Sequence, residues 1–327
     1  MPIIGLGTFQ IKDPESMKNV LTTAIDVGYK HIDTAFTYSN ENLIGAILKE
    51  MFNKGEIKRE DLFIVSKLPL NGMKPDAVEY FCNLSLTALQ LDYVDLYLLH
   101  FPVPSKRCDK DKEVFVIKDG VFVTDNINLM DTWKAMESLV EKGLTKSIGL
   151  SNCNSKQIQR IYDSAKIKPT VLQVECHAYF PQHELHEFCK KLNIAFTAYS
   201  PLGCPGFPEF ALKDWGIKDL DKPKLLEDIT LREISKKYDK SPAQILLRYL
   251  IQRGIAVIPK SSNPNRIKEN IQIFDFSLEN EDMNKMKSMS CGLRYITMTY
   301  WKGLRQIAVR VENVTNQRPL REKLRTD

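Results

Sequence analysis

The sequence predicts an α/β protein of a single domain, a (β/α)8 or TIM barrel, with long loops over the face where its strands end. Short apolar runs rich in Val, Ile, Leu and Phe recur along the chain, as is typical of buried parallel strands. Helical segments separate these runs, and such alternation favours a parallel sheet joined by right-handed crossovers. The length of 327 residues, of which 43% are hydrophobic, is sufficient for one barrel with loop insertions.

The apolar runs end in polar residues of distinct chemistry. The runs are residues 31–33, 62–67, 94–100, 147–152, 171–177, 194–200 and 255–260. In a barrel all strands point their carboxyl ends to one face, where such enzymes carry their active sites. We therefore expect the following polar residues to converge there: Asp33, Lys67, His100, Asn152, Gln173, Tyr199 and Lys260.

The predicted helices alternate with these strands. The first has Asp13 as its N-cap and Pro14 at its first position, and Gly143 ends the fourth. The predicted ranges are 14–27, 41–53, 75–90, 128–142, 154–165, 182–192, 225–238 and 242–252, with shorter helices over 266–271 and 279–288. Two connections, 101–127 and 201–220, are too long for simple turns. Because both follow strand ends, we expect long loops above the site.

Composition and charge exclude several classes of protein. The sequence contains no run of ~18 uncharged apolar residues, so we expect no membrane-spanning segment. Residues 302–327, which we expect to form a poorly ordered basic extension after a barrel over 1–301, hold +4 of the formal net charge of +5. A nearly neutral body argues against a nucleic-acid partner. The seven cysteines are scattered without a Cys-x-x-Cys pair, which predicts free thiols in a reducing cytoplasm.

The sequence departs from common cofactor and metal motifs. Gly5-Leu6-Gly7 lacks the third glycine of a dinucleotide-binding fingerprint. His183-Glu184-Leu185-His186 does not have the His-Glu-x-x-His spacing of a zinc site. We therefore expect neither a Rossmann fold nor a metal.

Asp33, Tyr38, Lys67 and His100 form a set suited to proton transfer to a carbonyl group. A tyrosine titrates near about pH 10 and is a weak acid at neutral pH, but a buried lysine ammonium beside it would lower its pKa. Asp33 would keep Lys67 charged, and His100 could donate a hydrogen bond to the substrate oxygen. Taken singly, each residue also fits a structural role. Their position at or just past successive strand ends favours catalysis.

This set requires a hydride donor, because no nucleophile in it lies beside a base. Asn152 and Gln173 have amides suited to the carboxamide of a nicotinamide ring, and Tyr199 offers a flat face for stacking. Residues 260–266 end a strand and open a helix. They supply two cations, hydroxyls and backbone N–H groups suited to a phosphate monoester. The same segment also fits an ordinary loop with a helix N-cap.

The sequence resembles the aldo-keto reductase family, in particular its aldose reductase-like members, over nearly all of residues 1–301. The matching stretches are GLGTF (5–9), DVGYKHIDTAFTYSNE (26–41), FIVSKL (63–68), LDYVDLYLLHFP (91–102), IGLSN (148–152), QVECH (173–177), AYSPLG (198–203) and IPKSSNPNRIKEN (258–270). Their number and order make the resemblance specific.

The resemblance implies a catalytic tetrad of Asp33, Tyr38, Lys67 and His100, with Tyr38 as the proton donor. It implies NADPH rather than NADH, because the family reads the 2′-phosphate at the positions of Lys260 and Arg266. The implied cofactor positions are Thr8, Ser151, Asn152, Gln173, Tyr199, Ser200, Leu202, Lys260, Ser261, Ser262, Asn263, Arg266, Glu269 and Asn270. The expected substrate-pocket residues are Phe9, Pro69, Phe101 and Trp301.

The sequence also departs from the family pattern. The family often has tryptophan where this chain has Phe9, Pro69 and Phe101, which would reshape the substrate pocket. The first strand of the hairpin that covers the bottom of the barrel in the family is missing, so we expect apolar residues there to lose cover. After Trp301 the tail no longer resembles the family.

We therefore expect a cytoplasmic, monomeric, NADPH-dependent reductase that acts on small-molecule aldehydes and ketones. The first alternative is a family barrel that binds NADPH but serves mainly as a binding, structural or regulatory protein; the intact tetrad speaks against it. The second is a barrel hydrolase that uses Asp33 and His100. For this hypothesis the sequence lacks a metal-binding cluster or an activated nucleophile.

Overall fold

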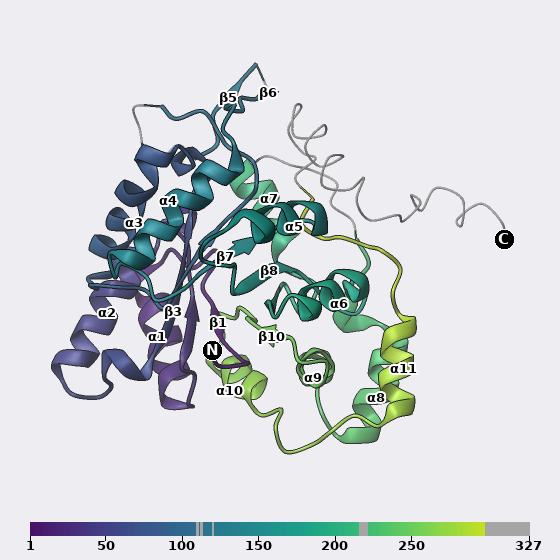
Figure 1. The fold of residues 1–327 in the computed structure, drawn as a ribbon. Coiled ribbons are helices and arrows are strands. Elements are labelled where there is room, and N and C mark those ends of the chain that lie inside the picture. The colour runs from purple at the N-terminus through teal and green to yellow at the C-terminus, as the bar shows by residue number, and fades with distance from the viewer. Residues whose placement is uncertain (109–110, 112–113, 120, 216–221, 298–327) are drawn as a thin grey trace.

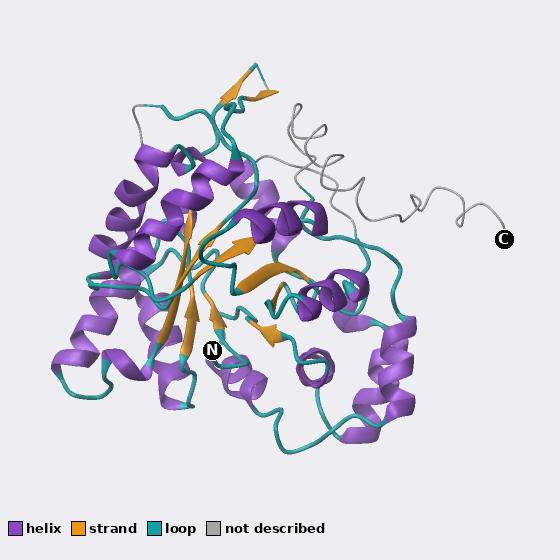
Figure 2. Cartoon of the chain, viewed as in Figure 1, coloured by secondary structure: helices purple, strands orange, loops and turns teal. Residues whose placement is uncertain are grey.

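The computed structural model describes residues 1–108, 111, 114–119, 121–215 and 222–297. Eight parallel strands form one sheet that curls into the predicted barrel, with each strand beside its neighbours in the chain (Figures 1 and 2). The strands are β1 (Leu6–Gly7), β2 (His31–Asp33), β3 (Phe63–Leu68), β4 (Leu96–Leu99), β7 (Ile148–Ser151), β8 (Val171–Glu175), β9 (Ala195–Tyr199) and β10 (Ala256–Val257). The predicted TIM-barrel fold is confirmed.

The barrel closes where the first strand meets the last. The Gly5 N–H donates to the Val257 carbonyl at 2.8 Å, and the Val257 N–H donates to the Ile3 carbonyl at 2.9 Å. At Gly7 the two backbones approach so closely that an added Cβ would lie 2.8 Å from the Ile258 carbonyl oxygen. The first strand and the last strand of the sheet thus complete the ring, and the seam requires glycine at its tightest point.

Helices form the outer layer around the strands (Figure 2). Side chains on their inner faces, such as Leu21 and Trp133, join one hydrophobic core with the strands. The helices are α1 (Pro14–Asp26), α2 (Glu41–Asn53), α3 (Pro75–Leu89), α4 (Leu129–Glu141), α5 (Ser155–Ser164), α6 (His183–Lys191), α7 (Phe207–Trp215), α8 (Ile229–Tyr238), α9 (Pro242–Gln252), α10 (Pro264–Ile271) and α11 (Asn280–Ser288). The predicted helix over 225–238 is divided, because the Asp228 carboxylate caps α8 and leaves a separate 3-10 turn at Leu225–Glu227.

Both long connections contain secondary structure, where we expected loops. The first carries a small antiparallel hairpin of β5 (Ile117–Lys118) and β6 (Val121–Phe122), which stands above the barrel (Figure 1). The second contains α7. Pro208 lies in the first turn of α7, where the missing N–H of proline is tolerated, so the proline content of this segment is compatible with a helix.

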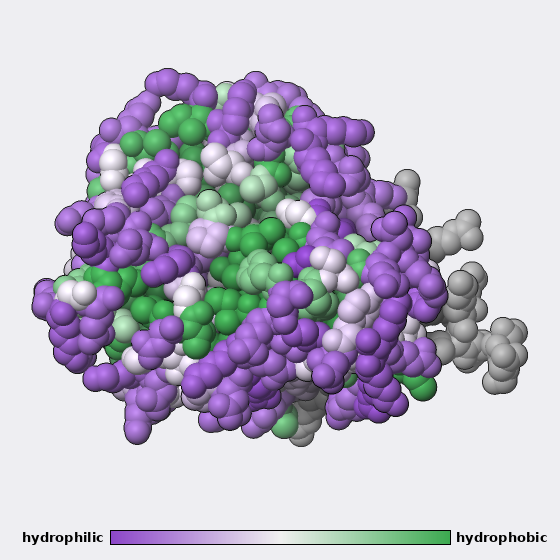
Figure 3. All heavy atoms as spheres, turned by 90° about the horizontal axis from the view of Figure 1, so that it is seen from below, coloured by the Kyte–Doolittle hydropathy of each residue, from purple (hydrophilic) through white to green (hydrophobic). Residues whose placement is uncertain are grey.

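The opposite end of the barrel shows apolar side chains within a hydrophilic rim (Figure 3). His31 is buried here; its ring centroid lies 5.3 Å from that of Phe63, and its Nδ1 lies 3.2 Å from the Pro2 carbonyl oxygen. Gly5 makes room for this ring, since an added Cβ would lie 2.6 Å from His31 Cγ. Burial lowers the pKa of His31 to about 4, so the ring is neutral at neutral pH.

Among the described residues, none of the helices has the length and the apolar composition that a membrane span requires. The proposed boundary between residues 301 and 302, the basic extension and Trp301 lie outside the described residues.

Candidate active site

The predicted tetrad comes together at the carboxyl ends of three neighbouring strands. Asp33 is the last residue of β2, Lys67 lies one residue before the end of β3, and His100 follows β4. Tyr38 ends η1 (Phe36–Tyr38), a single 3-10 turn that comes shortly after β2. Because β2, β3 and β4 pair in sequence order, their terminal side chains become neighbours.

Lys67 is the centre of a buried hydrogen-bond network. Its ammonium donates to Asp33 Oδ1 at 2.6 Å, to the Thr34 carbonyl at 2.8 Å and to the Tyr38 hydroxyl at 3.4 Å. The side chains of Lys67 and Asp33 are 0% and 2% exposed. Burial lowers the pKa of Lys67, and the charge of Asp33 opposes this effect. The three ammonium protons therefore have fixed partners.

Gln173 holds the second oxygen of Asp33. Its Nε2 donates to Asp33 Oδ2 at 2.7 Å, which joins β8 to β2. The sequence assigns this amide to the cofactor alone, because no pattern in it links two residues that lie 140 positions apart. Within the described residues Gln173 Oε1 accepts no hydrogen bond, so this oxygen can still receive one from a ligand.

The acidity of Tyr38 differs from our expectation that Lys67 lowers its pKa. Burial, and then the charge of Asp33, raise the pKa of Tyr38 well above its ordinary value. The physical reason is that Asp33 lies 2.6 Å from Lys67, so a phenolate would face an ion pair rather than a free cation. Tyr38 is therefore protonated at neutral pH, which is the form that a proton donor requires.

His100 is a buried, neutral histidine. Burial, and then the charge of Lys67, lower its pKa well below the ordinary range. Its ring stacks on Phe101, a predicted pocket residue, with centroids 5.1 Å apart, and meets the Tyr38 ring edge-on at 5.8 Å. The hydroxyl of Thr37 lies 3.3 Å from His100 Nδ1. Sequence reasoning did not identify Thr37 as part of the site.

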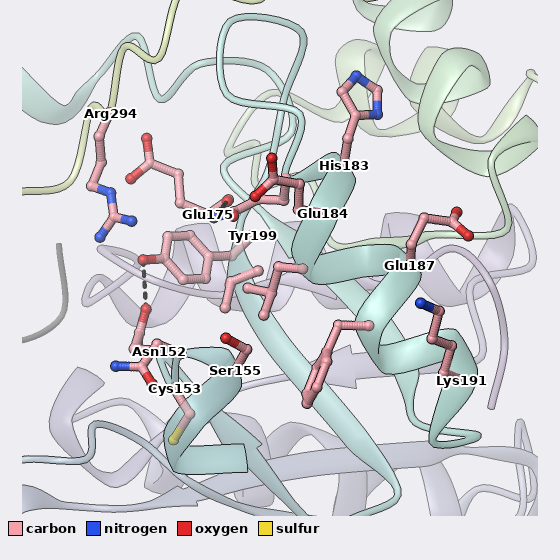
Figure 4. Close-up of a pocket in the computed structure, with 15 residues that line it drawn as sticks. Asn152, Cys153, Ser155, Glu175, His183, Glu184, Glu187, Lys191, Tyr199 and Arg294 are labelled. Carbon is pink, nitrogen blue, oxygen red and sulfur yellow. Dashed lines mark hydrogen bonds between the residues drawn. The ribbon is translucent and has the colours of Figure 1, made fainter. Parts of the chain in front are cut away.

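A cavity of about 570 Å³ lies beside α5 and α6, and Asn152 and Tyr199 border it (Figure 4). Asn152 Oδ1 accepts a hydrogen bond from the Tyr199 hydroxyl at 2.9 Å. Its Nδ2 donates to Ser151 Oγ at 3.0 Å and to the His100 carbonyl at 2.9 Å. The tetrad does not line this cavity, which meets the site through Asn152. The predicted nicotinamide residues Ser151, Asn152 and Tyr199 are thus brought together.

The predicted phosphate-binding segment precedes and opens α10. Asn263 caps this helix, with its Oδ1 accepting from the N–H groups of Asn265 at 2.9 Å and Arg266 at 3.3 Å. Lys260 and Arg266 are exposed side chains. The ammonium of Lys260 is still partly shielded from water by neighbouring groups, and this desolvation, followed by the charge of Arg266, lowers the pKa of Lys260. The segment is therefore a helix cap, as one interpretation held, and it also presents two neighbouring cations.

Thr8 and Asn40 hold the end of β2, which carries Asp33. The Thr8 hydroxyl and N–H donate to the Asp33 carbonyl at 2.9 and 3.1 Å. Asn40 donates from Nδ2 to the Thr8 carbonyl at 2.8 Å and accepts from the Thr34 hydroxyl at 2.9 Å. Thr8, predicted at a cofactor position, thus supports the fold here. Asn40 was missed, because nothing in its own stretch of sequence shows which backbone groups it reaches.

The remaining predicted cofactor positions follow the neighbouring strands β9 and β10. They are Ser200, Leu202, Ser261, Ser262, Glu269 and Asn270. Because β9 and β10 pair in parallel, the segments that follow them leave the barrel on the same face. Ser200 has a left-handed φ of 50°, which turns the chain sharply after β9. These positions stay predictions.

Aromatic residues pack in a row beside the ring of Tyr38. The Phe9 ring lies 4.9 Å from that of Tyr38 and 5.2 Å from that of Phe210, between centroids. Phe210 comes from α7, and we did not predict it because its segment was expected to be a loop. Pro69, which follows β3, is buried. The aromatic wall beside Tyr38 therefore includes a residue from the second long connection.

Comparison with known proteins agrees with this geometry. The family described as Aldo/keto reductase family matches residues 3–290. This chain belongs to the aldo-keto reductase family. Aldo-keto reductase family 1 member A1 of Gallus gallus is 47% identical over 298 residues, which cover 90% of this chain and 88% of that protein. Aldo-keto reductase family 1 member C15 of Rattus norvegicus is 42% identical over 306 residues, covering 92% and 91%.

A solved structure extends the comparison to three dimensions. The aldose reductase from Schistosoma japonicum superimposes with a TM-score of 0.82 at 38% identity, and the match covers 99% of this chain and 96% of that one. The predicted family and fold are thereby confirmed. As a member of the aldo-keto reductase family, the protein is an oxidoreductase, and the family generally uses a nicotinamide cofactor.

Proposed function

We propose that this aldo-keto reductase reduces aldehydes and ketones to alcohols with NADPH, and that Tyr38 supplies the proton. The observation that supports this most directly is the position of the Tyr38 hydroxyl. It lies 3.4 Å from the buried ammonium of Lys67, and its ring meets the neutral ring of His100 edge-on. A protonated phenol beside a neutral imidazole pairs a proton source with a hydrogen-bond donor, which is what a carbonyl oxygen needs during reduction.

The chain's own residues account for the proton. Negative charge develops on the carbonyl oxygen as its carbon is reduced, and a hydrogen bond from His100 stabilises this charge. Tyr38 then gives its proton to that oxygen, which completes the alcohol. The phenolate that remains lies beside the Lys67 ammonium, which Asp33 keeps charged and Gln173 keeps in place through Asp33.

The site has donors and acceptors that fit a nicotinamide cofactor, which supplies the hydride when it is bound. Asn152 Oδ1 has a second lone pair and Gln173 Oε1 is unpartnered within the described residues, so both can accept from a carboxamide N–H. Tyr199 offers a ring face for stacking. The cations Lys260 and Arg266 at the start of α10 suit a 2′-phosphate, which favours NADPH over NADH.

The experiment that tests this proposal follows the loss of NADPH absorbance with a small panel of carbonyl compounds. The panel contains a nitrobenzaldehyde, glyceraldehyde and a bulky ketone. We expect turnover of at least one compound and its loss in Tyr38→Phe. Tyr80→Phe, an equal change at an exposed residue of α3, serves as the matched control and should keep full activity.

A second measurement separates the proposal from its alternative. Binding of NADPH should quench the tryptophan fluorescence of the wild type and of Tyr38→Phe to the same extent. Quenching without turnover of any compound in the wild type would contradict the proposed reduction and favour a binding or regulatory role. Full turnover in Tyr38→Phe would contradict the assignment of the proton donor.

A further inference from the structure

The hydroxyl of Thr37 lies beside Nδ1, one of the two ring nitrogens of His100. Thr37 Oγ1 lies 3.3 Å from His100 Nδ1. Among the described residues, this contact is the only hydrogen bond of the His100 ring. It is also the only hydrogen bond of Thr37 Oγ1 there. The two groups are therefore each other's polar partners within the described protein.

The backbone fixes Thr37 and Tyr38 as one unit. Both belong to η1, where the Tyr38 N–H donates to the Ala35 carbonyl at 2.9 Å and the Ser39 N–H donates to the Phe36 carbonyl at 3.2 Å. A single tight turn thus places one hydroxyl against His100 and the next one against Lys67. Groups held in this way lose little freedom when the reaction occurs.

The chemistry of a neutral imidazole gives this contact a consequence. One of its nitrogens carries a hydrogen and the other accepts, and the hydrogen bond at one nitrogen decides which form is present. If the Thr37 hydroxyl donates to Nδ1, the hydrogen of His100 lies on Nε2. If His100 donated from Nδ1 instead, Nε2 would only accept and could not donate to a carbonyl oxygen. The hydroxyl proton of Thr37 would also lose its one acceptor in the described protein.

We propose that Thr37 is a positioning residue that donates to Nδ1 and so holds His100 as the Nε2–H tautomer, ready to donate to the substrate carbonyl. The inference rests on the proposed reduction for its purpose. Lys67 cannot take over this task, because its three protons are directed to Asp33, Thr34 and Tyr38. The hydroxyl on η1 is thus what sets the direction of the hydrogen bond from His100.

The tautomer can be read directly from a proton–nitrogen correlation spectrum of isotope-labelled protein. The chain has five histidines, and the signals of His100 are those lost in His100→Phe. His31 provides an internal reference of the opposite kind, since its Nδ1 lies 3.2 Å from the Pro2 carbonyl and must carry the hydrogen. We expect the Nε2–H pattern for wild-type His100. An Nδ1–H pattern would overturn the proposal, whatever the activity of the protein.

Two substitutions at position 37 test the role of the hydroxyl. Thr37→Val keeps the shape and removes the donor, so we expect the His100 signals to become those of mixed tautomers. We also expect kcat to fall about tenfold, as for the loss of one hydrogen bond, with KM changed little. Thr37→Ser restores the donor and should return both readouts to near wild type. Thr87→Val, at an exposed site of α3, should change neither.

The outcomes distinguish this inference from the proposed function. An unchanged His100 tautomer together with an unchanged kcat in Thr37→Val would refute the positioning role while leaving the reduction intact. Absence of turnover in every protein, including the wild type, would refute the reduction, and the spectra would still decide whether Thr37 sets the tautomer. If Thr37→Val fails to fold, the wild-type and Thr37→Ser spectra decide.

Discussion

His31 and His100 are buried at opposite ends of the barrel, and the two residues differ in what their ring nitrogens meet. Burial is the main cause of the lowered pKa of both His31 and His100. At the amino ends of the strands, His31 Nδ1 donates to a backbone carbonyl, and Nε2 is buried with no hydrogen-bond partner among the described residues. At the carboxyl ends, His100 Nδ1 meets a hydroxyl, and Nε2 is not among the buried unpartnered atoms of the described residues. Burial alone therefore does not separate His100, the proposed catalytic histidine, from His31; the partners of their ring nitrogens do.

The largest effect expected from this comparison is on turnover. His100→Phe keeps a ring in place but removes the hydrogen bond to the carbonyl oxygen, so kcat should fall by roughly 10²–10³-fold. The free energy of unfolding should change little. His31→Ala is the matched variant at the other end, and it should lower the free energy of unfolding while kcat stays near wild type. Kinetics and chemical denaturation of both variants check this; equal losses of kcat would remove the distinction between the ends.

The second prediction concerns the free energy of unfolding at acidic pH. The pKa of His31 is about 4 in the folded protein and about 6.5 when unfolded, so the unfolded state takes up the proton first as the pH falls. The stability that His31 contributes is present above about pH 6.5 and is lost toward about pH 4, a change of about 3 kcal/mol.

The measurement is the free energy of unfolding against pH for the wild type and for His31→Gln. His186, whose pKa burial also lowers to about 4, contributes in both proteins, so the difference between the two curves isolates His31. Parallel curves between pH 6.5 and 4 would show that His31 does not titrate in this way.

A smaller effect is expected from packing beside His31. In Gly5→Ala the new Cβ would meet the His31 ring at 2.6 Å, so the free energy of unfolding should fall by about 1–3 kcal/mol. Turnover should not change, since the strain lies at the end of the barrel away from Tyr38. Gly206→Ala adds a Cβ with no atom within 4 Å and is the control. Thermal unfolding of both variants gives the comparison, and equal stability would contradict the tight packing at Gly5.

The smallest expected effect is on cofactor binding at the carboxyl ends of the strands. Lys260→Ala removes one of the two cations at the start of α10, so the dissociation constant for NADPH should rise roughly tenfold while that for NADH changes little. Lys49→Ala, at an exposed site of α2, is the control. Fluorescence titration with both cofactors measures the ratio, and equal losses for NADPH and NADH would refute a contact with the 2′-phosphate.

Much of this site could be predicted because strand ends are visible in the sequence. Asp33, Lys67 and His100 close apolar runs, and parallel strands carry such ends to one face. Tyr38 follows in the next turn. These inferences need only the local pattern and the topology of a barrel.

Other features depend on contacts between distant segments and could not be predicted. The hydrogen bond from Gln173 to Asp33 joins residues that lie 140 positions apart in the sequence. The ring contact of Phe210 with Phe9 depends on the helix α7, which was expected to be a loop. The pKa of Tyr38 was expected to fall. It rises, because burial and Asp33 outweigh a cation that is already paired, and only distances show this balance.

The seam between β1 and β10 has a consequence for synthesis on the ribosome. Ile3 and Gly5 pair with Val257, so the first strand leaves the exit tunnel long before its partner is translated. Until then one margin of the growing sheet has open N–H and C=O groups, the kind of edge that invites pairing with other chains. Thr8, which fixes the carbonyl of Asp33, directly follows that first strand. Protection by a chaperone in this interval would therefore guard both the closure of the ring and the backbone position of Asp33, the proposed catalytic carboxylate.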